Sequence, residues 1–105
     1  MSTAVTNNST QNDAVRVALY ESTDGIPSAG SAPATGDTLI YQTTRTRSTA
    51  SSNSETTSHV ARSGLTPGVT YYYYHALAAP SGGTANLVGG DNQTTILVQT
   101  MPSMG

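Results

Sequence analysis

The side chains that could carry chemistry are two histidines, six acids and 13 serines in a chain of 105 residues. His59 and His75 could bind a metal if the fold brought them together, but neither has a carboxylate or a third histidine at a recognised ligand spacing. Asp24 and Asp91 could contribute to a calcium site. However, the residues around Asp24 lack the repeated oxygen ligands of such loops, and turn formation explains both aspartates better. With no Gly-x-Ser-x-Gly elbow either, the sequence predicts no catalytic site, no metal site and no cofactor.

Aromatic and basic side chains are the candidates for binding a partner. In an extended run, Tyr72 and Tyr74 fall on one face of a strand, where they could stack on sugar rings or pack into a protein interface. Packing against neighbouring strands is the simpler alternative. Arg45, Arg47 and Arg62 could pair with acids across an interface, although solvated arginines are the default.

Composition excludes several classes of function. The chain has no lysine, four scattered arginines and a net charge of −2, so we expect no nucleic-acid partner. It has no cysteine, which excludes disulfides and thiolate chemistry. The first residues have neither a basic nor an apolar segment of a secretory signal, and no window reaches transmembrane length. We therefore expect no membrane partner. We also expect that the chain is either clipped from a precursor or made in a cytoplasm and released by another route, such as host lysis by a virus.

The elements that position these residues are predicted to be strands. Apolar residues alternate with other residues over 14–21, and strand character returns over 38–46, 57–62, 69–79 and 94–100. The aromatic run in 69–79 predicts the central strand. Only 16 residues are Leu, Ile or Val and none is Phe or Trp, which predicts a thin core. Thin cores commonly need stabilisation from neighbours.

The segments outside these strands are polar or rich in glycine and proline. Residues 1–13 are predicted to be a flexible arm, or an arm that orders on a neighbouring subunit by adding Ala4 and Val5 to a sheet edge. Residues 14–100 form the single predicted domain, and residues 101–105 a tail. The loops over 22–37 and 47–57 are expected to face solvent or a partner.

One stretch indicates a specific fold. Leu65 precedes Thr66-Pro67-Gly68, in which Pro67 presets the first central φ of a turn and Gly68 can take a positive φ at the second. Tyr71 follows and opens the aromatic strand. Leu65, Pro67, Gly68 and Tyr71 resemble the corner of fibronectin type III modules, which are Ig-like antiparallel β-sandwiches. The resemblance implies that the Tyr71 hydroxyl bonds to the backbone just upstream.

The resemblance also sets an expected number of strands. A full module of that family has seven, whereas the sequence predicts five, and either residues 3–7 or residues 85–89 could supply short additional strands. A sandwich lacking its first strands exposes edges and core that a neighbouring chain would complete.

An incomplete, cysteine-free module of this composition looks like a structural protein. We therefore expect a non-catalytic protein that assembles on itself or on a larger scaffold. By analogy it resembles a capsid decoration or cement protein of a bacteriophage, bound to the major capsid or another virion protein and located in the virion. The alternative is an extracellular module that binds carbohydrate or a cell surface through Tyr72 and Tyr74.

Overall fold

The chain is all-β in the computed structural model, which describes every residue except 9–13, 30, 47–53, 80–84, 88–93 and 100–105. The described residues contain strands and no helix, and every strand pairing is antiparallel. The strands are β1 (Ser2–Asn8), β2 (Ala14–Ser22), β3 (Thr38–Thr46), β4 (Ser54–Ser58), β5 (Tyr72–Ala78), β6 (Ala85–Leu87) and β7 (Thr95–Ile96).

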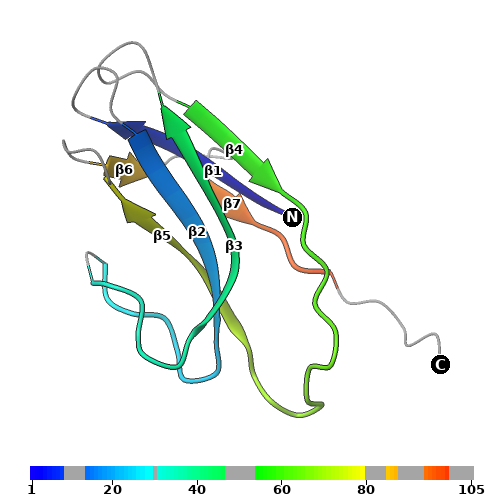
Figure 1. Ribbon diagram of the computed structural model, residues 1–105. Helices are drawn as coiled ribbons and strands as arrows, with labels where there is room; N and C mark the ends of the chain where they lie inside the picture. Colours follow the sequence, from blue (N-terminus) through cyan, green and yellow to red (C-terminus); the bar gives the residue numbers. More distant parts are fainter. Residues whose placement is uncertain (9–13, 30, 47–53, 80–84, 88–93, 100–105) are drawn as a thin grey trace.

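The strands form two sheets that face each other (Figure 1). Sheet A has the order β4-β1-β6, with β7 pairing with the other end of β1. Sheet B has the order β3-β2-β5. The sheets share one core, because Ala4 of sheet A packs with Val15 and Val17 of sheet B. Two long connections, residues 23–37 and residues 59–71, lie at the same end of the molecule, which is the lower end in Figure 1.

The N-terminal segment corrects the prediction of an arm over residues 1–13. Residues 2–8 form β1, which pairs along β4 on one side and with β6 and β7 on the other. Ser2, Ala4 and Thr6 alternate with more exposed or undescribed positions and are all buried. Their side chains are small, so the polar composition that suggested a flexible arm still fits a strand with a buried face.

The centre of sheet B is β2, and β5 lies at its edge. The prediction that residues 69–79 form the central strand is therefore wrong. Alternation along β2 places Val15, Val17, Leu19 and Glu21 on the face toward sheet A. Through the β2–β5 register, Tyr73, His75 and Leu77 share that face. Aromatic residues favour strands generally, so their abundance did not distinguish an edge strand from a central one.

Other predicted strands differ in extent. The prediction for 38–46 is confirmed by β3, and that for 14–21 by β2, which runs one residue further. The strand predicted at 57–62 lies earlier, as β4, and among the described residues of 94–100 the strand is Thr95–Ile96. With β1 and β6, the described part of the chain has seven strands. The predicted shortage of strands is thus corrected, and it no longer supports assembly.

The interior is rich in hydroxyl groups. Ser2, Thr6, Thr56 and Ser58 are all buried on sheet A, and the Ser2 and Ser58 hydroxyl oxygens lie 2.8 Å apart in a hydrogen bond. The core cluster of Ala4, Val15 and Val17 adds only small apolar side chains. The prediction of a thin core agrees with this interior, in which polar pairing replaces part of the usual aliphatic packing.

Candidate functional site

The connection over residues 59–71 contains the predicted turn and corner. The Val69 amide donates to the Thr66 carbonyl at 3.3 Å, and Gly68 has a φ of 86°. A positive φ at the second central position is the signature of a type II turn, which Pro67 favours at the first. The Tyr71 hydroxyl accepts a hydrogen bond from the Thr66 amide at 2.9 Å. This is the upstream backbone contact that the resemblance implies for Tyr71.

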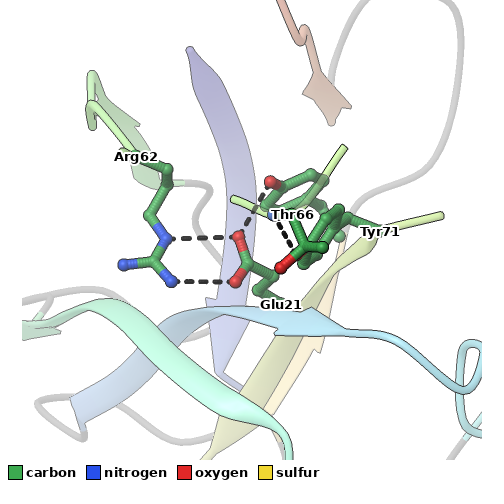
Figure 2. A network of polar contacts seen from close by, with 5 residues as sticks. Glu21, Arg62, Thr66 and Tyr71 are labelled. Atoms are coloured by element: carbon green, nitrogen blue, oxygen red, sulfur yellow. Dashed lines mark hydrogen bonds and ion pairs between the residues drawn. The ribbon is translucent and has the colours of Figure 1, made fainter. Parts of the chain in front are cut away.

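A buried carboxylate anchors this connection to sheet B (Figure 2). Glu21 ends the inward-facing series of β2 and is only 5% exposed. Arg62 donates to it through Nε at 3.2 Å and through Nη2 at 2.8 Å. The Tyr73 hydroxyl, opposite Glu21 on β5, donates at 2.8 Å. We call Glu21, Arg62 and Tyr73 the Glu21 cluster, which joins β2, β5 and the 59–71 connection.

The electrostatics of the Glu21 cluster favour the ionised carboxylate. The Arg62 hydrogen bonds lower the pKa of Glu21 and outweigh the opposing effect of burial. Burial raises the pKa of Tyr73, and its bond to Glu21 raises it further. The Arg62 pKa is raised by the same carboxylate. A carboxylate that accepts three hydrogen bonds and is held ionised is suited to anchoring a loop and poorly suited to accepting a substrate proton.

Tyr74 is covered by the other long connection. Its ring stacks on Tyr20, with centroids 5.5 Å apart and an interplanar angle of 11°. Its hydroxyl donates to Asp37 Oδ2 at 2.6 Å. Burial and the Asp37 carboxylate raise the pKa of Tyr74 to about 12. Tyr72 is 38% exposed whereas Tyr74 is 9% exposed, so the two rings do not form the open platform predicted for sugar binding.

The other candidate partner residues have different surroundings. Ala4 is 1% exposed and lies in the core cluster. Val5 pairs with Glu55 of this chain, and Arg45 pairs with Val15. Arg47 lies outside the described residues.

The histidines are not part of a metal site in the described part of the chain, where no three His, Asp or Glu side chains come together. His59 is exposed. His75 has a buried Nε2 without a hydrogen-bond partner, and burial lowers its pKa.

Asp24 accepts a hydrogen bond from the Ser22 hydroxyl at 2.5 Å, and the Asp24 amide donates back to that oxygen at 3.2 Å. This local contact is typical of a turn-forming aspartate.

The surface carries many large apolar side chains, and the sequence patterns did not predict their exposure. Those exposed by more than a third are Met1, Ile26, Leu39, Val60, Leu65, Val69, Tyr72, Leu97 and Val98. Part of this set gathers at one end of sheet A, because Met1 and Leu97 exchange two backbone hydrogen bonds of 2.8 and 2.9 Å. We call Met1 and Leu97 the sheet A patch. The apolar run at 96–98 is the available signal, but such a run predicts a strand without showing whether its side chains are covered.

No helix in the described residues is long and apolar enough to cross a membrane. Comparison of the chain with protein-family models, with curated proteins and with solved structures gives no match.

Proposed function

We propose that this protein is a non-catalytic structural module with a fibronectin type III-like sandwich fold, which assembles on copies of itself or on a larger scaffold. The fold type is supported by the corner formed by Leu65, Pro67, Gly68 and Tyr71, with its bond from the Thr66 amide to the Tyr71 hydroxyl. Two antiparallel sheets around one core are compatible with it. The proposal of assembly has a separate basis.

The distribution of aliphatic side chains carries the proposal of assembly. Among the described Leu, Ile and Val residues, Val15, Val17 and Leu19 are buried, whereas Ile26, Leu39, Val60, Leu65, Val69, Leu97 and Val98 are exposed. These side chains are already partly covered, so each would gain on the order of 1 kcal/mol if it were fully buried. Exposed apolar side chains that cluster, as in the sheet A patch, mark interaction surfaces more often than scattered ones do.

The more specific form of the proposal is a bacteriophage virion component, such as a capsid decoration protein, made in the host cytoplasm. It is supported by composition: 31 Ser and Thr residues and no cysteine. The partner would be the major capsid protein or another virion protein. Locating the chain in a density map of a purified particle would test this form, and its absence from the particle would exclude it.

The alternative of a glycan-binding module has less support. Its platform needs two open rings, but Tyr74 is stacked on Tyr20 and bonded to Asp37. A monomeric chain that binds glycans and shows no self-association would favour this alternative over assembly.

Sedimentation of the full chain over a range of concentrations tests self-association. We expect an average mass that rises with concentration, and a smaller rise in Leu97→Ser, which makes the sheet A patch polar. Thr95→Ser is the matched control, because Thr95 is also exposed on β7 but lies outside the patch. The proposed function is wrong if the wild-type chain stays monomeric at all concentrations and also binds to no larger scaffold.

A further inference from the structure

The outward face of sheet B contains a hollow that no part of the proposed function uses. Its volume is about 170 Å³, and its lining comes from three strands and the 23–37 connection: Arg16, Ala18, Tyr20, Pro33, Gln42, Ala76, Leu77 and Ala78. We call it the Arg16 hollow. Its β2 residues lie on the opposite face from Val15, Val17 and Leu19, and Leu77 is the lining residue that also packs against the core cluster.

The register of sheet B explains why there is space here. Ala18 is paired with Gln42 on β3 and with Ala76 on β5, so two methyl groups occupy the centre of the sheet where larger side chains usually stand. At one end of this space, Tyr20 is paired with Tyr74, and their stacked rings form a wall. In the other direction Arg16 stands opposite Ala78. Tyr20 lies four positions after Arg16, which is about 13 Å along a strand.

Arg16 brings an unused positive charge to this space. The ion pair formed among the described residues is that of Arg62 with Glu21, and Arg16 has no carboxylate partner there. Its Nε is buried and makes no hydrogen bond. The buried Nε is out of reach of water and of a ligand oxygen, so the terminal nitrogens of the Arg16 guanidinium are the donors that a ligand would meet. The two terminal nitrogens of a guanidinium form a planar pair of donors that matches a carboxylate.

We propose that the Arg16 hollow binds a small carboxylate with a flat apolar body, whose carboxylate lies at Arg16 and whose body covers Ala18 and Ala76. A cavity of about 150 Å³ accommodates a benzene ring, so the hollow has room for a ligand of that size. The side-chain amide of Gln42 is available to orient the carboxylate, and Tyr20 limits the length of the body. Such a carboxylate belongs either to a free organic acid or to the last residue of a peptide chain.

Benzoate is the probe that tests the proposal, with benzamide as its neutral analogue of the same shape. Each would be titrated to about 20 mM into the isotope-labelled full chain, and the amide resonances followed by NMR. For so small a ligand we expect a Kd on the order of 1 mM. The shifts should centre on Arg16, Ala18, Gln42 and Ala76, and benzamide should give little or none, because it lacks the charge.

Variants assign the binding to the hollow. Arg16→Gln should weaken the binding of benzoate by about tenfold or more, since it removes a charge-assisted pair of hydrogen bonds. Ala76→Ile should also abolish binding while leaving the charge unchanged, because it fills the floor with a side chain that suits a strand. Arg45→Gln is the matched control, which removes the same charge from β3 and should bind as wild type does. The dispersion of each variant's amide spectrum shows that it is folded.

Three results would overturn the proposal: no shifts with benzoate, equal shifts with benzamide, or binding that survives both Arg16→Gln and Ala76→Ile.

A second series of ligands distinguishes the two sources of the carboxylate. If acetyl-Gly-Gly-Phe with a free terminus binds more tightly than benzoate, and its terminal amide does not bind, the ligand is a chain end. If the added residues prevent binding while benzoate binds, the ligand is a free acid. These results are independent of whether the protein self-associates.

Discussion

Replacing Glu21 by glutamine tests the structural role given to the Glu21 cluster. The substitution keeps the shape of the side chain and removes its charge. Glu21 accepts hydrogen bonds from Arg62 and Tyr73 only through oxygens. In the variant one oxygen becomes an NH2 group that faces donors, so at least one of the Arg62 hydrogen bonds or the Tyr73 hydrogen bond is lost.

The magnitude follows from the number and exposure of these bonds. A hydrogen bond to a charged group contributes about 1.5–3 kcal/mol net. Because the Arg62 side chain is 35% exposed, water can replace part of the lost contact, and the low end of that range applies. We expect Glu21→Gln to lower the free energy of unfolding by about 2 kcal/mol. For a domain of this size, the Tm should fall by about 8–16 °C.

The pH dependence separates a charge effect from a packing effect. The folded-state pKa of Glu21 lies below its ordinary value of 4.5. Its contribution to stability is therefore complete above the ordinary carboxyl range and is lost as the pH falls through the folded-state pKa. Urea unfolding of wild type and variant, followed by tyrosine fluorescence, should give a constant difference near neutral pH. That difference should shrink in acid.

Glu55→Gln provides the matched control, because it makes the same chemical change on β4. Alternation along β4 places position 55 on the other strand face from the buried Thr56 and Ser58, so we expect a change within about 0.5 kcal/mol. The reasoning is refuted if Glu21→Gln is as stable as wild type at pH 7, or if its deficit is the same at pH 7 and in strong acid.

Three further predictions concern single hydroxyl groups. Tyr71→Phe removes the acceptor of the Thr66 amide; it should cost about 0.5–1 kcal/mol and speed hydrogen exchange at that amide. The pKa of Tyr74 is raised to about 12, so its contribution is complete below the ordinary tyrosine value of 10 and is lost as the pH rises toward 12; absorbance titration should show a tyrosine that titrates near 12 and is missing in Tyr74→Phe. Thr56→Val replaces a buried hydroxyl that has no hydrogen-bond partner and should stabilise the protein by about 1 kcal/mol in thermal unfolding.

The sequence was most informative where local geometry decides the structure. The turn at Pro67 and Gly68 depends on the φ values of two adjacent residues, and β2 and β3 show alternation or a clear apolar centre. The position of β1 was less predictable, because its buried Ser2 and Thr6 are residues that usually face solvent. Their burial depends on partners such as Ser58, which is 56 residues away from Ser2.

The Glu21 cluster illustrates the same limit at the candidate site. Glu21 extends the alternation of β2 and could have been placed on the inward face, but an acid there gives no indication of its partner. Arg62 comes from a connection between the sheets, and the sequence offers no spacing that relates it to Glu21. The hollow at Arg16 was equally hidden, since Ala18 and Ala76 become neighbours only through the β2–β5 register.

Buried hydroxyls and exposed aliphatics in one chain have a common consequence. Hydroxyl pairs such as Ser2 with Ser58 hold strands in register through direction and distance, but each adds less net free energy than a well-packed Leu would. Meanwhile the sheet A patch remains in water, where its apolar area contributes nothing to the stability of the isolated chain. Burying that patch on another molecule would therefore add stability that the interior lacks. Association and thermal stability should rise together with protein concentration, as mass action requires.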